Sequence, residues 1–318
     1  MQLSIVVTSY DPQRRRDITD LLDSIHVQLC NDFELVYVTE RSKLLYNFVK
    51  ESIEKRGIRG KVIHNEGSWG LSECRNIGVE HSKGEVIAFV DDDVILDSNW
   101  SCAILNAFKS LDGIIGATGP AYPYWLDNRV DWLPTELDWL IGCTRWFKSN
   151  VPVQVRNCWG MNMCFAREAF QKAGYFDVRS TERSRYLRSA SGQRQHEETE
   201  QGKMAEDVEY SLRVKRMTGK KLYYLPDMRV LSKVYSYRLS SRFIVSRSSY
   251  IGYSRRNIAK VAGNRQLTIE NSLLVSLLRS LLLQNRNRPN LTGELKKTKV
   301  SILVLFSIAL GYFLGQLA

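Results

Sequence analysis

The sequence predicts an α/β fold with a mostly parallel central sheet flanked by helices. Residues 3–118 alternate short apolar segments with segments whose apolar residues recur at helical spacing. This alternation is typical of a parallel sheet that helices cover on both faces. A second observation is a run of three aspartates directly after an apolar segment, at the edge where such sheets bind ligands. A third is an uncharged C-terminal stretch, which sets the last residues apart from this domain.

Each expected element has its own signal. LSIVVTSY, at residues 3–10, is rich in apolar and β-branched residues and is expected to form the first strand. Ile18, Leu21, Leu22 and Ile25 recur at helical spacing and predict the first helix. The later strands are expected at FELVYV, KVIH, EVIAFV and GIIGATG, and the later helices at KLLYNFVKESIEK, LSECRNIGVEHS and SNWSCAILNAFKS.

The composition is that of a globular protein with an excess of basic residues. Of the 318 residues, 44% are hydrophobic and 25% charged, and the formal net charge is +11. This charge favours acidic or phosphate-bearing partners, without separating nucleotides from nucleic acid or anionic lipid. No two cysteines form a Cys-x-x-Cys pair, so a zinc or redox motif is not expected. We therefore expect six small, mostly buried apolar side chains in a reducing compartment: Cys30, Cys74, Cys102, Cys143, Cys158 and Cys164.

The C-terminal stretch predicts attachment to a membrane. From Val300, the sequence VSILVLFSIALGYFLGQL carries no charge and has the roughly 17 to 25 residues that cross a bilayer. A buried core helix is the alternative, which the lack of a polar face disfavours. Lys296, Lys297 and Lys299 precede the stretch, and positive residues stay on the cytoplasmic side. The sequence thus predicts a single-pass protein of the cell membrane, with its large N-terminal part on the cytoplasmic side.

A basic region precedes this stretch. No acidic residue occurs from Met228 to Ile269, where arginines and lysines are interleaved with tyrosines. Nucleic-acid binding is one interpretation. A membrane-surface element is favoured, and no nucleic-acid partner is expected, because a spanning segment follows. Residues 267–283 are apolar but contain Glu270 and Arg279, which favours an interfacial or packed helix over a second crossing. Whether they lie on or in the membrane stays open.

The three adjacent aspartates point to a metal ion. Two unit charges about 4 Å apart repel by ~1 kcal/mol in water and ~4 kcal/mol at an intermediate dielectric. Asp91, Asp92 and Asp93 therefore require a compensating cation, and Mg²⁺ or Mn²⁺ binds through one or two carboxylates together with substrate phosphates. In an extended segment, Asp91 and Asp93 would point the same way and address one site. The alternative is a solvated turn that caps the next helix, and the run by itself does not decide between them.

Five segments resemble, in order, the motifs of glycosyltransferase family 2, the inverting nucleotide-sugar enzymes with the GT-A fold. The resemblance extends over residues 1–235. The segments are TSYDP from Thr8, GLSECRNIG from Gly70, FVDDD, WGMNMCFAREAF from Trp159 followed by GYFD, and AEDVEYSLRVKRMTGKKLYYLPD. The resemblance implies a GT-A fold and metal-dependent sugar transfer.

The resemblance assigns a donor site. Asp91 would contact the ribose and, with Asp93, hold Mn²⁺ or Mg²⁺, which would neutralise charge as the nucleotide leaves. Arg75 would add positive charge near the phosphates, with a surface salt bridge as its alternative, and Asn76 is expected to order the loop beside the donor. Many family members have a metal-binding His beyond Pro226. Here Lys233 occupies that region and would face phosphate, so a third metal ligand is left open.

The nucleoside end shows a departure from the family. The loop with Thr8 and Tyr10 would hold the nucleoside. The family often has Asp-Asp-Gly-Ser after the second strand, where an Asp reads the base, but residues 39–42 are Thr-Glu-Arg-Ser. Glu40 would make the same contact with a longer side chain, unless the base differs.

The resemblance places the catalytic base at Asp207. The family's Glu-Asp pair matches Glu206 and Asp207. An inverting displacement needs a carboxylate to take the proton of the acceptor hydroxyl as it attacks the anomeric carbon from the opposite face. A helix is expected to follow, and its dipole would keep Asp207 ionised. A plain N-cap is the alternative role, and Glu206 is expected to support the base.

The acceptor side would be lined by Trp159, Gly160 and Asn162. Gly160 would let a substrate approach the backbone closely, because it has no side chain. Asn162 would hydrogen-bond a sugar hydroxyl. A packed strand is the alternative for this segment.

The sequence therefore predicts three parts. Residues 1–235 form a GT-A domain, in which residues 1–118 bind the nucleotide sugar and residues 119–235 carry the acceptor site and base. Residues 236–298 are expected to form basic amphipathic helices at the membrane surface, and residues 299–318 to span the membrane.

The predicted activity is inverting transfer of a sugar from a nucleotide-sugar donor to a membrane-associated acceptor, polyprenyl- or dolichyl-linked. One alternative is a sugar-phosphate nucleotidyltransferase, which usually needs a Gly-rich basic loop that TSYDPQRRR does not provide. The other is a membrane-tethered nucleotide-binding scaffold without turnover.

Overall fold

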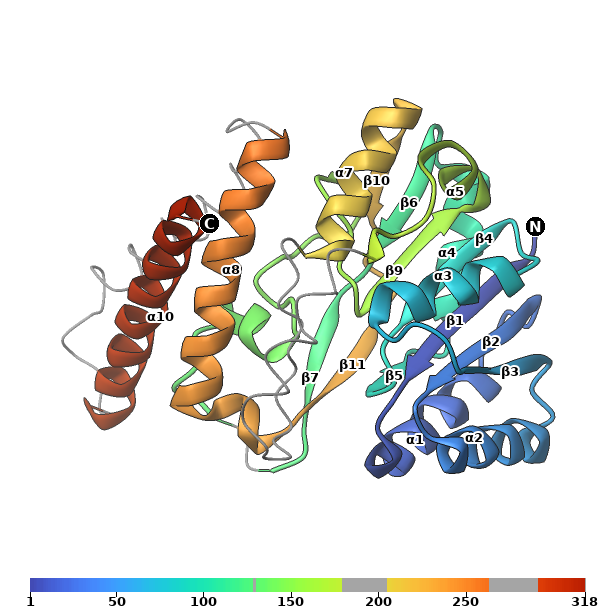
Figure 1. Ribbon diagram of the computed structural model, residues 1–318, viewed down its shortest axis with the longest axis horizontal. Helices are drawn as coiled ribbons and strands as arrows, with labels where there is room; N and C mark the ends of the chain where they lie inside the picture. The colour runs from blue at the N-terminus through green and yellow to red at the C-terminus, as the bar shows by residue number, and fades with distance from the viewer. Residues whose placement is uncertain (128–129, 179–204, 263–290, 318) are drawn as a thin grey trace. The chain divides into compact units, whose positions relative to one another are not determined.

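The fold is described from a computed structural model, which covers residues 1–127, 130–178, 205–262 and 291–317 (Figure 1). The chain forms two compact units. Unit 1 comprises Met1–Tyr122 and Ser149–Ser232, and unit 2 comprises Pro123–Lys148 and Lys233–Ala318. Residues 267–283, for which the sequence left the relation to the membrane open, lie outside the described residues.

Unit 1 contains an eight-stranded sheet in the order β3-β2-β1-β4-β9-β6-β10-β8. The first four of these strands pair in parallel, and β9 runs antiparallel between β4 and β6. The predicted α/β fold with a mostly parallel sheet is confirmed. The strands are β1 (Leu3–Ser9), β2 (Phe33–Glu40), β3 (Gly60–Asn65), β4 (Val86–Val90), β6 (Ile114–Thr118), β8 (Val153–Val155), β9 (Asn162–Ala166) and β10 (Lys221–Tyr224).

A smaller sheet has the order β5-β11-β7. Its strands are β5 (Val94–Leu96), β11 (Val230–Val234) and β7 (Ala121–Trp125), and both β7 and β11 continue from unit 1 into unit 2. The helices of unit 1 are α1 (Arg15–His26), α2 (Lys43–Arg56), α3 (Leu71–His81), α4 (Trp100–Ser110), α5 (Arg167–Ala173) and α7 (Glu206–Thr218), with a short 3-10 helix η1 (Pro12–Arg14) before α1.

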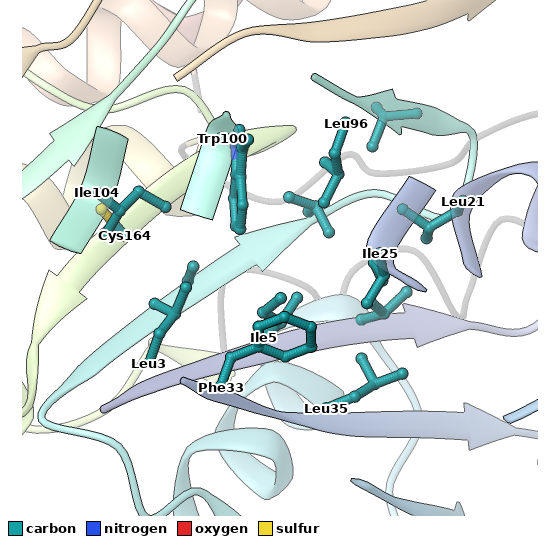
Figure 2. Packing of buried hydrophobic residues seen from close by; sticks show 14 of the residues in the cluster. Leu3, Ile5, Leu21, Ile25, Phe33, Leu35, Leu96, Trp100, Ile104 and Cys164 are labelled. Atoms are coloured by element: carbon teal, nitrogen blue, oxygen red, sulfur yellow. The ribbon is translucent and has the colours of Figure 1, made fainter. Parts of the chain in front are cut away.

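Helices cover both faces of the large sheet because its central strands are apolar on both sides. On one face, Leu3 and Ile5 of β1 pack with Leu21 of α1 and Trp100 of α4 (Figure 2). On the other face, Gly78 of α3 lies so close to Val6 that an added Cβ would come within 2.3 Å of it. Burial of both faces explains why the sequence shows continuous apolar runs here rather than strict alternation.

Local signals set the helix ends near the sheet edge. Asp11 accepts a hydrogen bond from the Gln13 N–H at 2.9 Å, which caps η1 ahead of Pro12. Ser42 caps α2 in the same way through the Leu45 N–H. These caps fix the loops that follow β1 and β2, where ligands are expected to bind.

Unit 2 has its own apolar core. It contains the 3-10 helices η2 (Thr135–Ile141) and η4 (Ser236–Leu239) and the helices α8 (Ser241–Ala262) and α10 (Leu291–Leu317). Leu137 and Ile141 of η2 pack in one cluster with Ile244 of α8 and with Val304 and Ile308 of α10. Within the described part of the chain, Leu295–Gly315 of α10 is the one candidate membrane span, judged by length and composition.

The expectation of six free cysteines was wrong for one pair. Cys30, before β2, and Cys102, in α4, form a disulfide with their Cα atoms 5.1 Å apart. They are 72 residues apart in sequence, and only the packing of the chain brings them within bonding range. Cys74, Cys143, Cys158 and Cys164 are free and buried, as expected.

Candidate active site

The ends of four neighbouring parallel strands form the candidate site of unit 1. Because β3, β2, β1 and β4 are adjacent and parallel, the loops after their carboxyl ends meet at one edge of the sheet. Tyr10 follows β1, Glu40 ends β2, and Asp91 follows β4. The sequence had placed its donor-site residues at these ends.

The aspartate run forms a turn rather than the extended segment that the sequence favoured. The side chain of Asp91 is 42% exposed, whereas that of Asp93 is only 3% exposed. Asp92 accepts hydrogen bonds from Ser9 Oγ at 2.6 Å and from Arg14 Nη1 at 2.7 Å. The same Arg14 Nη1 lies 3.3 Å from Asp93 Oδ2. The turn therefore directs Asp92 and Asp93 to one guanidinium and leaves Asp91 the most exposed of the three.

Two carboxyls of this run, those of Asp91 and Asp92, have raised pKa values. The pKa of Asp91 is raised to about 7: although part of its side chain is exposed, desolvation of the carboxyl is the main cause, Asp93 and Asp92 contribute, and Arg75 opposes the rise. Burial is also the main cause that raises the pKa of Asp92, with Arg14 opposing it. The carboxyls of Asp91 and Asp92 therefore favour the protonated form. A divalent cation prefers such oxygen ligands, and it would replace the protons as the compensating positive charge.

A cation bound here would need ligands from the substrate as well. In the described ranges, no group of three or more His, Cys, Asp or Glu side chains is arranged to hold a metal ion. One or two carboxylates completed by phosphate oxygens is the usual arrangement for Mg²⁺. Lys233 is buried at the end of β11, where the resemblance placed a third ligand in other members.

Arg75 connects the aspartate run to the start of α7. Its side chain is almost fully buried, which excludes the surface salt bridge considered from the sequence. Nη1 lies 2.7 Å from Glu206 Oε1, and Nη2 lies 3.7 Å from Asp91 Oδ1. Nη2 also donates to the carbonyl oxygen of Gly160 at 3.2 Å. One guanidinium thus joins residues that are more than 100 positions apart in sequence.

Asp207 lies in the first turn of α7, one residue inside the helix. Ala205 occupies the N-cap position, so the plain N-cap role considered for Asp207 does not hold. Oδ2 of Asp207 accepts a hydrogen bond from the Gly160 N–H at 2.9 Å, and Oδ1 accepts one from the Val208 N–H at 2.8 Å. The backbone N–H of Gly160 therefore donates to Asp207, and its carbonyl oxygen accepts from Arg75.

The carboxyl of Asp207 has a pKa close to neutral pH. Burial, followed by the charge of Glu206, raises its pKa to about 6, while the Gly160 N–H and Arg75 oppose the rise. The helix dipole was expected to hold the pKa down, but desolvation outweighs it. The group is still mostly ionised at pH 7, and a base with a pKa near the working pH is well suited to accept a proton.

Two asparagines predicted for the site form hydrogen bonds with other residues of the chain. Asn76 exchanges two hydrogen bonds of 2.9 Å with the backbone of Phe176. Its role in ordering the loop beside the donor stays a prediction. Asn162 is fully buried, where its amide accepts from Trp100 Nε1 and donates to the Met228 carbonyl. The expected contact between Asn162 and a sugar hydroxyl was therefore wrong, because neighbours already use its donor and acceptor. Trp159 is half-buried and packs edge-on against the ring of Tyr224.

The nucleoside end is arranged differently from expectation. Glu40 is buried, and its carboxylate accepts from the Gly70 N–H at 2.9 Å and lies 3.4 Å from Arg41 Nε. The expected contact between Glu40 and a base is therefore not available in this structure. Arg41 takes a left-handed backbone conformation with φ of 70°, and its guanidinium lies 5.1 Å from the Tyr10 ring centroid and 5.2 Å from that of Trp69. Both rings are exposed.

Sequence reasoning missed Arg14, Arg41 and Trp69. The arginine run in TSYDPQRRR was a signal for Arg14, but nothing in it showed which arginine would reach the aspartates. Arg41 was noted only as a departure from the family pattern. Thr8 lies in β1 and is half-buried, next to the loop that carries Tyr10.

Comparison with known proteins decides the family. The sequence model described as "Glycosyl transferase family 2" matches residues 4–174, which is more than half of the chain. The chain is a family 2 glycosyltransferase. This assignment sets aside the nucleotidyltransferase and scaffold alternatives that the sequence had left open. The resemblance to this family is confirmed, and the match extends over four of the five motifs; the fifth, from Ala205, lies beyond the matched residues.

Relatives of this glycosyltransferase extend the match. A glucosyl-dolichyl phosphate glucuronosyltransferase of Haloferax volcanii is 26% identical over 258 residues, which cover 80% of this chain and 77% of the relative. Among solved structures, a mannosyltransferase of Pyrobaculum calidifontis in complex with GDP-Man and Mn²⁺ superposes with a TM-score of 0.62 at 14% identity, covering 98% of this chain and 87% of that one. TarS of S. aureus, residues 1–349 with UDP-GlcNAc, gives a TM-score of 0.53 at 15% identity, with 98% and 84% covered. These structures share the fold.

Replacement of Gly160 by alanine is expected to slow the glycosyltransferase about tenfold without unfolding it. An added Cβ would lie 3.3 Å from Arg75 Nη2 and 3.4 Å from Asp207 Oδ2, so both groups must shift by a few tenths of an ångström. Small displacements of reacting groups cost rate rather than stability. Steady-state kinetics and a melting curve check this, with Gly67→Ala as the control, since its Cβ would meet little. An unchanged kcat for Gly160→Ala would contradict it.

Proposed function

We propose that this glycosyltransferase moves a sugar, with inversion, from a nucleotide-sugar donor to a lipid-linked acceptor at the cytoplasmic face of the membrane. The observation that carries the proposal is the linkage Asp91–Arg75–Gly160–Asp207. It brings a donor-side carboxylate and, through Gly160, a candidate base to the same nitrogen of one buried guanidinium. Donor and acceptor groups can then be held on opposite sides of a reacting carbon.

The donor would lie along the carboxyl ends of the strands. Asp91 is the exposed carboxylate of its run and is suited to contact the ribose and share a cation with Asp93. Tyr10 and Trp69 present exposed rings that both lie beside Arg41, and we propose that they stack a nucleoside base at the end near β2. The solved neighbours were complexed with GDP-Man or UDP-GlcNAc, so the base is not carried over to this chain.

A divalent cation fits the donor side. Mn²⁺ is present in the Pyrobaculum mannosyltransferase complex, and the carboxylates of this chain offer oxygen donors with unneutralised charge. When bound, Mn²⁺ or Mg²⁺ would neutralise charge that develops on the departing diphosphate. Asp93 would bind the cation and give up its contact with Arg14.

Asp207 would serve as the base. Its carboxylate takes the proton of the acceptor hydroxyl while that oxygen forms a bond to the anomeric carbon. The bond from this carbon to the diphosphate oxygen breaks on the opposite face, and the electron pair leaves with the nucleotide. Glu206 would hold Arg75 in place, and the backbone of Gly160 would hold Asp207 at the acceptor side with Trp159 nearby.

The acceptor is proposed to be carried on a polyprenyl or dolichyl lipid. The Haloferax relative is named for a glucosyl-dolichyl phosphate substrate, and α10 of this chain has the composition of a membrane-associated helix. The cytoplasmic side is proposed because Lys296, Lys297 and Lys299, before the apolar stretch, suit the anionic lipids of the cytoplasmic leaflet. We expect no nucleic-acid partner.

A donor panel tests the proposal. The purified full chain is incubated in detergent with Mn²⁺ or Mg²⁺ and a set of UDP-, GDP- and TDP-sugars, and release of the nucleoside diphosphate is followed. We expect slow hydrolysis of one or two donors, faster release when a dolichyl phosphate glycolipid is added, and none with EDTA. Release that is equal for all donors, or that is unaffected by EDTA, would overturn the proposed site.

A further inference from the structure

Helix α10 has two unlike faces. Ser301, Val304, Ser307 and Ile308 are buried within unit 2. The opposite side carries large apolar side chains that the other described residues leave exposed. We call this set the α10 stripe: Leu295, Ile302, Phe306, Leu310, Phe313 and Leu314. No Asp, Glu, Lys or Arg interrupts the chain from Val300 to Leu317. An uncharged stripe of this size requires a nonaqueous partner.

The buried face of α10 packs tightly along α8, and the two helices lie side by side (Figure 1). A Cβ added at Gly252 would lie 2.0 Å from the Ile308 carbonyl oxygen, and one added at Gly315 would lie 3.2 Å from Arg256 Cβ. Close approach through small residues fixes this pairing over several turns. Ile244 shares a cluster with Val304, and Arg256 meets Gly315, so the two helices run in the same direction.

This pairing conflicts with an upright crossing. From Val300 to Leu317, α10 is about 27 Å long at ~1.5 Å per residue, close to the thickness of a bilayer core. If it stood upright, α8 from Ile244 to Arg256 would lie at the same depth, and it carries Arg247, Arg255 and Arg256. Charged side chains at that depth are costly and rare.

The 3-10 helix η2 adds a second conflict. Leu137 and Ile141 pack with Val304 and Ile308, near the middle of the apolar stretch. An upright α10 would draw this folded segment into the hydrocarbon, together with Asp138 and Arg145, which pair with each other.

We propose that α10 lies in the plane of the membrane surface, with the α10 stripe in the lipid and α8 and η2 on its aqueous side. In this arrangement α10 does not cross the bilayer, and its C-terminal end stays on the same side as unit 1. It replaces the single crossing expected from composition, and it stands independently of the chemistry proposed for the site.

The charges around α10 favour an anionic lipid surface. Lys296 and Lys299 are exposed at the start of the apolar stretch, and Arg242 is exposed at the start of α8. Lys296 also lies 4.8 Å from the ring centroid of Trp132, and tryptophan and lysine are both common at the interface of a membrane. An amphipathic helix with basic neighbours binds such a surface in its plane.

Topology gives the decisive test. The full chain is made in cells with a cysteine tag after Ala318, and sealed vesicles with unit 1 outside are treated with a membrane-impermeant maleimide. Lys50→Cys, exposed on α2, reports the side of unit 1. We expect the tag and Lys50→Cys to be labelled equally without detergent. A tag that is labelled only after detergent is added would show that α10 crosses, and would overturn the proposal.

Vesicle binding tests the stripe itself. Phe306→Glu is expected to weaken partition of the full chain onto vesicles of phosphatidylglycerol and phosphatidylcholine at least tenfold, with an unchanged melting temperature in detergent. Leu44→Glu, on an exposed apolar position of α2, serves as the matched control and is expected to bind as the parent does. If Phe306→Glu instead lowers the melting temperature and leaves binding intact, the stripe is covered by protein and the proposal fails. Neither result depends on donor hydrolysis, so failure here leaves the proposed activity standing.

Discussion

Replacement of Asp207 by asparagine is expected to reduce sugar transfer about 100- to 10,000-fold, the contribution typical of a positioned general base. The amide keeps an oxygen for the Gly160 N–H, whose bond to Asp207 is 2.9 Å long, so the local structure should persist. Only the ability to accept a proton is lost. Donor affinity, measured by nucleotide-sugar titration, should change less than threefold.

Glu206→Gln is the matched control for this prediction. Glu206 is bonded to Arg75 rather than to Gly160, so its neutral variant should lose part of the positioning of Arg75 and only a modest part of kcat. If Glu206→Gln proves as damaging as Asp207→Asn, and Asp207→Asn keeps transfer, the base has been assigned to the wrong residue.

The pH dependence follows from the same group. Because the pKa of Asp207 is raised to about 6, kcat/KM should be constant above pH 6 and fall about tenfold per pH unit below it.

A raised folded-state pKa also means that the folded protein holds this proton more tightly than the unfolded chain. That stabilisation is complete below the unfolded pKa and is lost as the pH rises through about 6. Asp207→Asn should therefore melt at the same or a higher temperature at pH 7.

The second large effect is expected at Asp93. Asp93→Asn should lower transfer about 1,000-fold, because a weaker ligand for Mn²⁺ or Mg²⁺ leaves several kcal/mol of charge on the departing diphosphate uncompensated. Raising the metal concentration should restore part of the rate. The apparent metal affinity, from transfer rates against Mn²⁺ concentration, measures the change.

Asp92→Asn separates binding of the metal from structure in this run. Asp92 holds Ser9 and Arg14 together, so its neutral variant should lower the melting temperature and alter metal affinity little. Equal metal affinities for Asp93→Asn and the parent chain would show that Asp93 stays with Arg14 and that the cation is bound without it.

The chain sequence determined the architecture because its signals are local. Continuous apolar strands between amphipathic helices could only be buried as a covered parallel sheet, and this fixed which residues lie at the ligand-binding edge. The order of five short motifs fixed the family. Asp91, Asp93 and Asp207 were singled out in this way, and in the structure Asp91 lies beside Arg75, which bonds to Gly160, which in turn bonds to Asp207.

Only the tertiary structure decided how polar side chains are used, because burial and contacts between distant segments decide which of them a substrate can reach. Glu40 is used by the Gly70 N–H, and Asn162 by Trp100 and Met228. The disulfide between Cys30 and Cys102 likewise depends on packing across 72 residues. Residue types and spacing show which groups are present, whereas their partners are set by contacts between segments that the sequence keeps far apart.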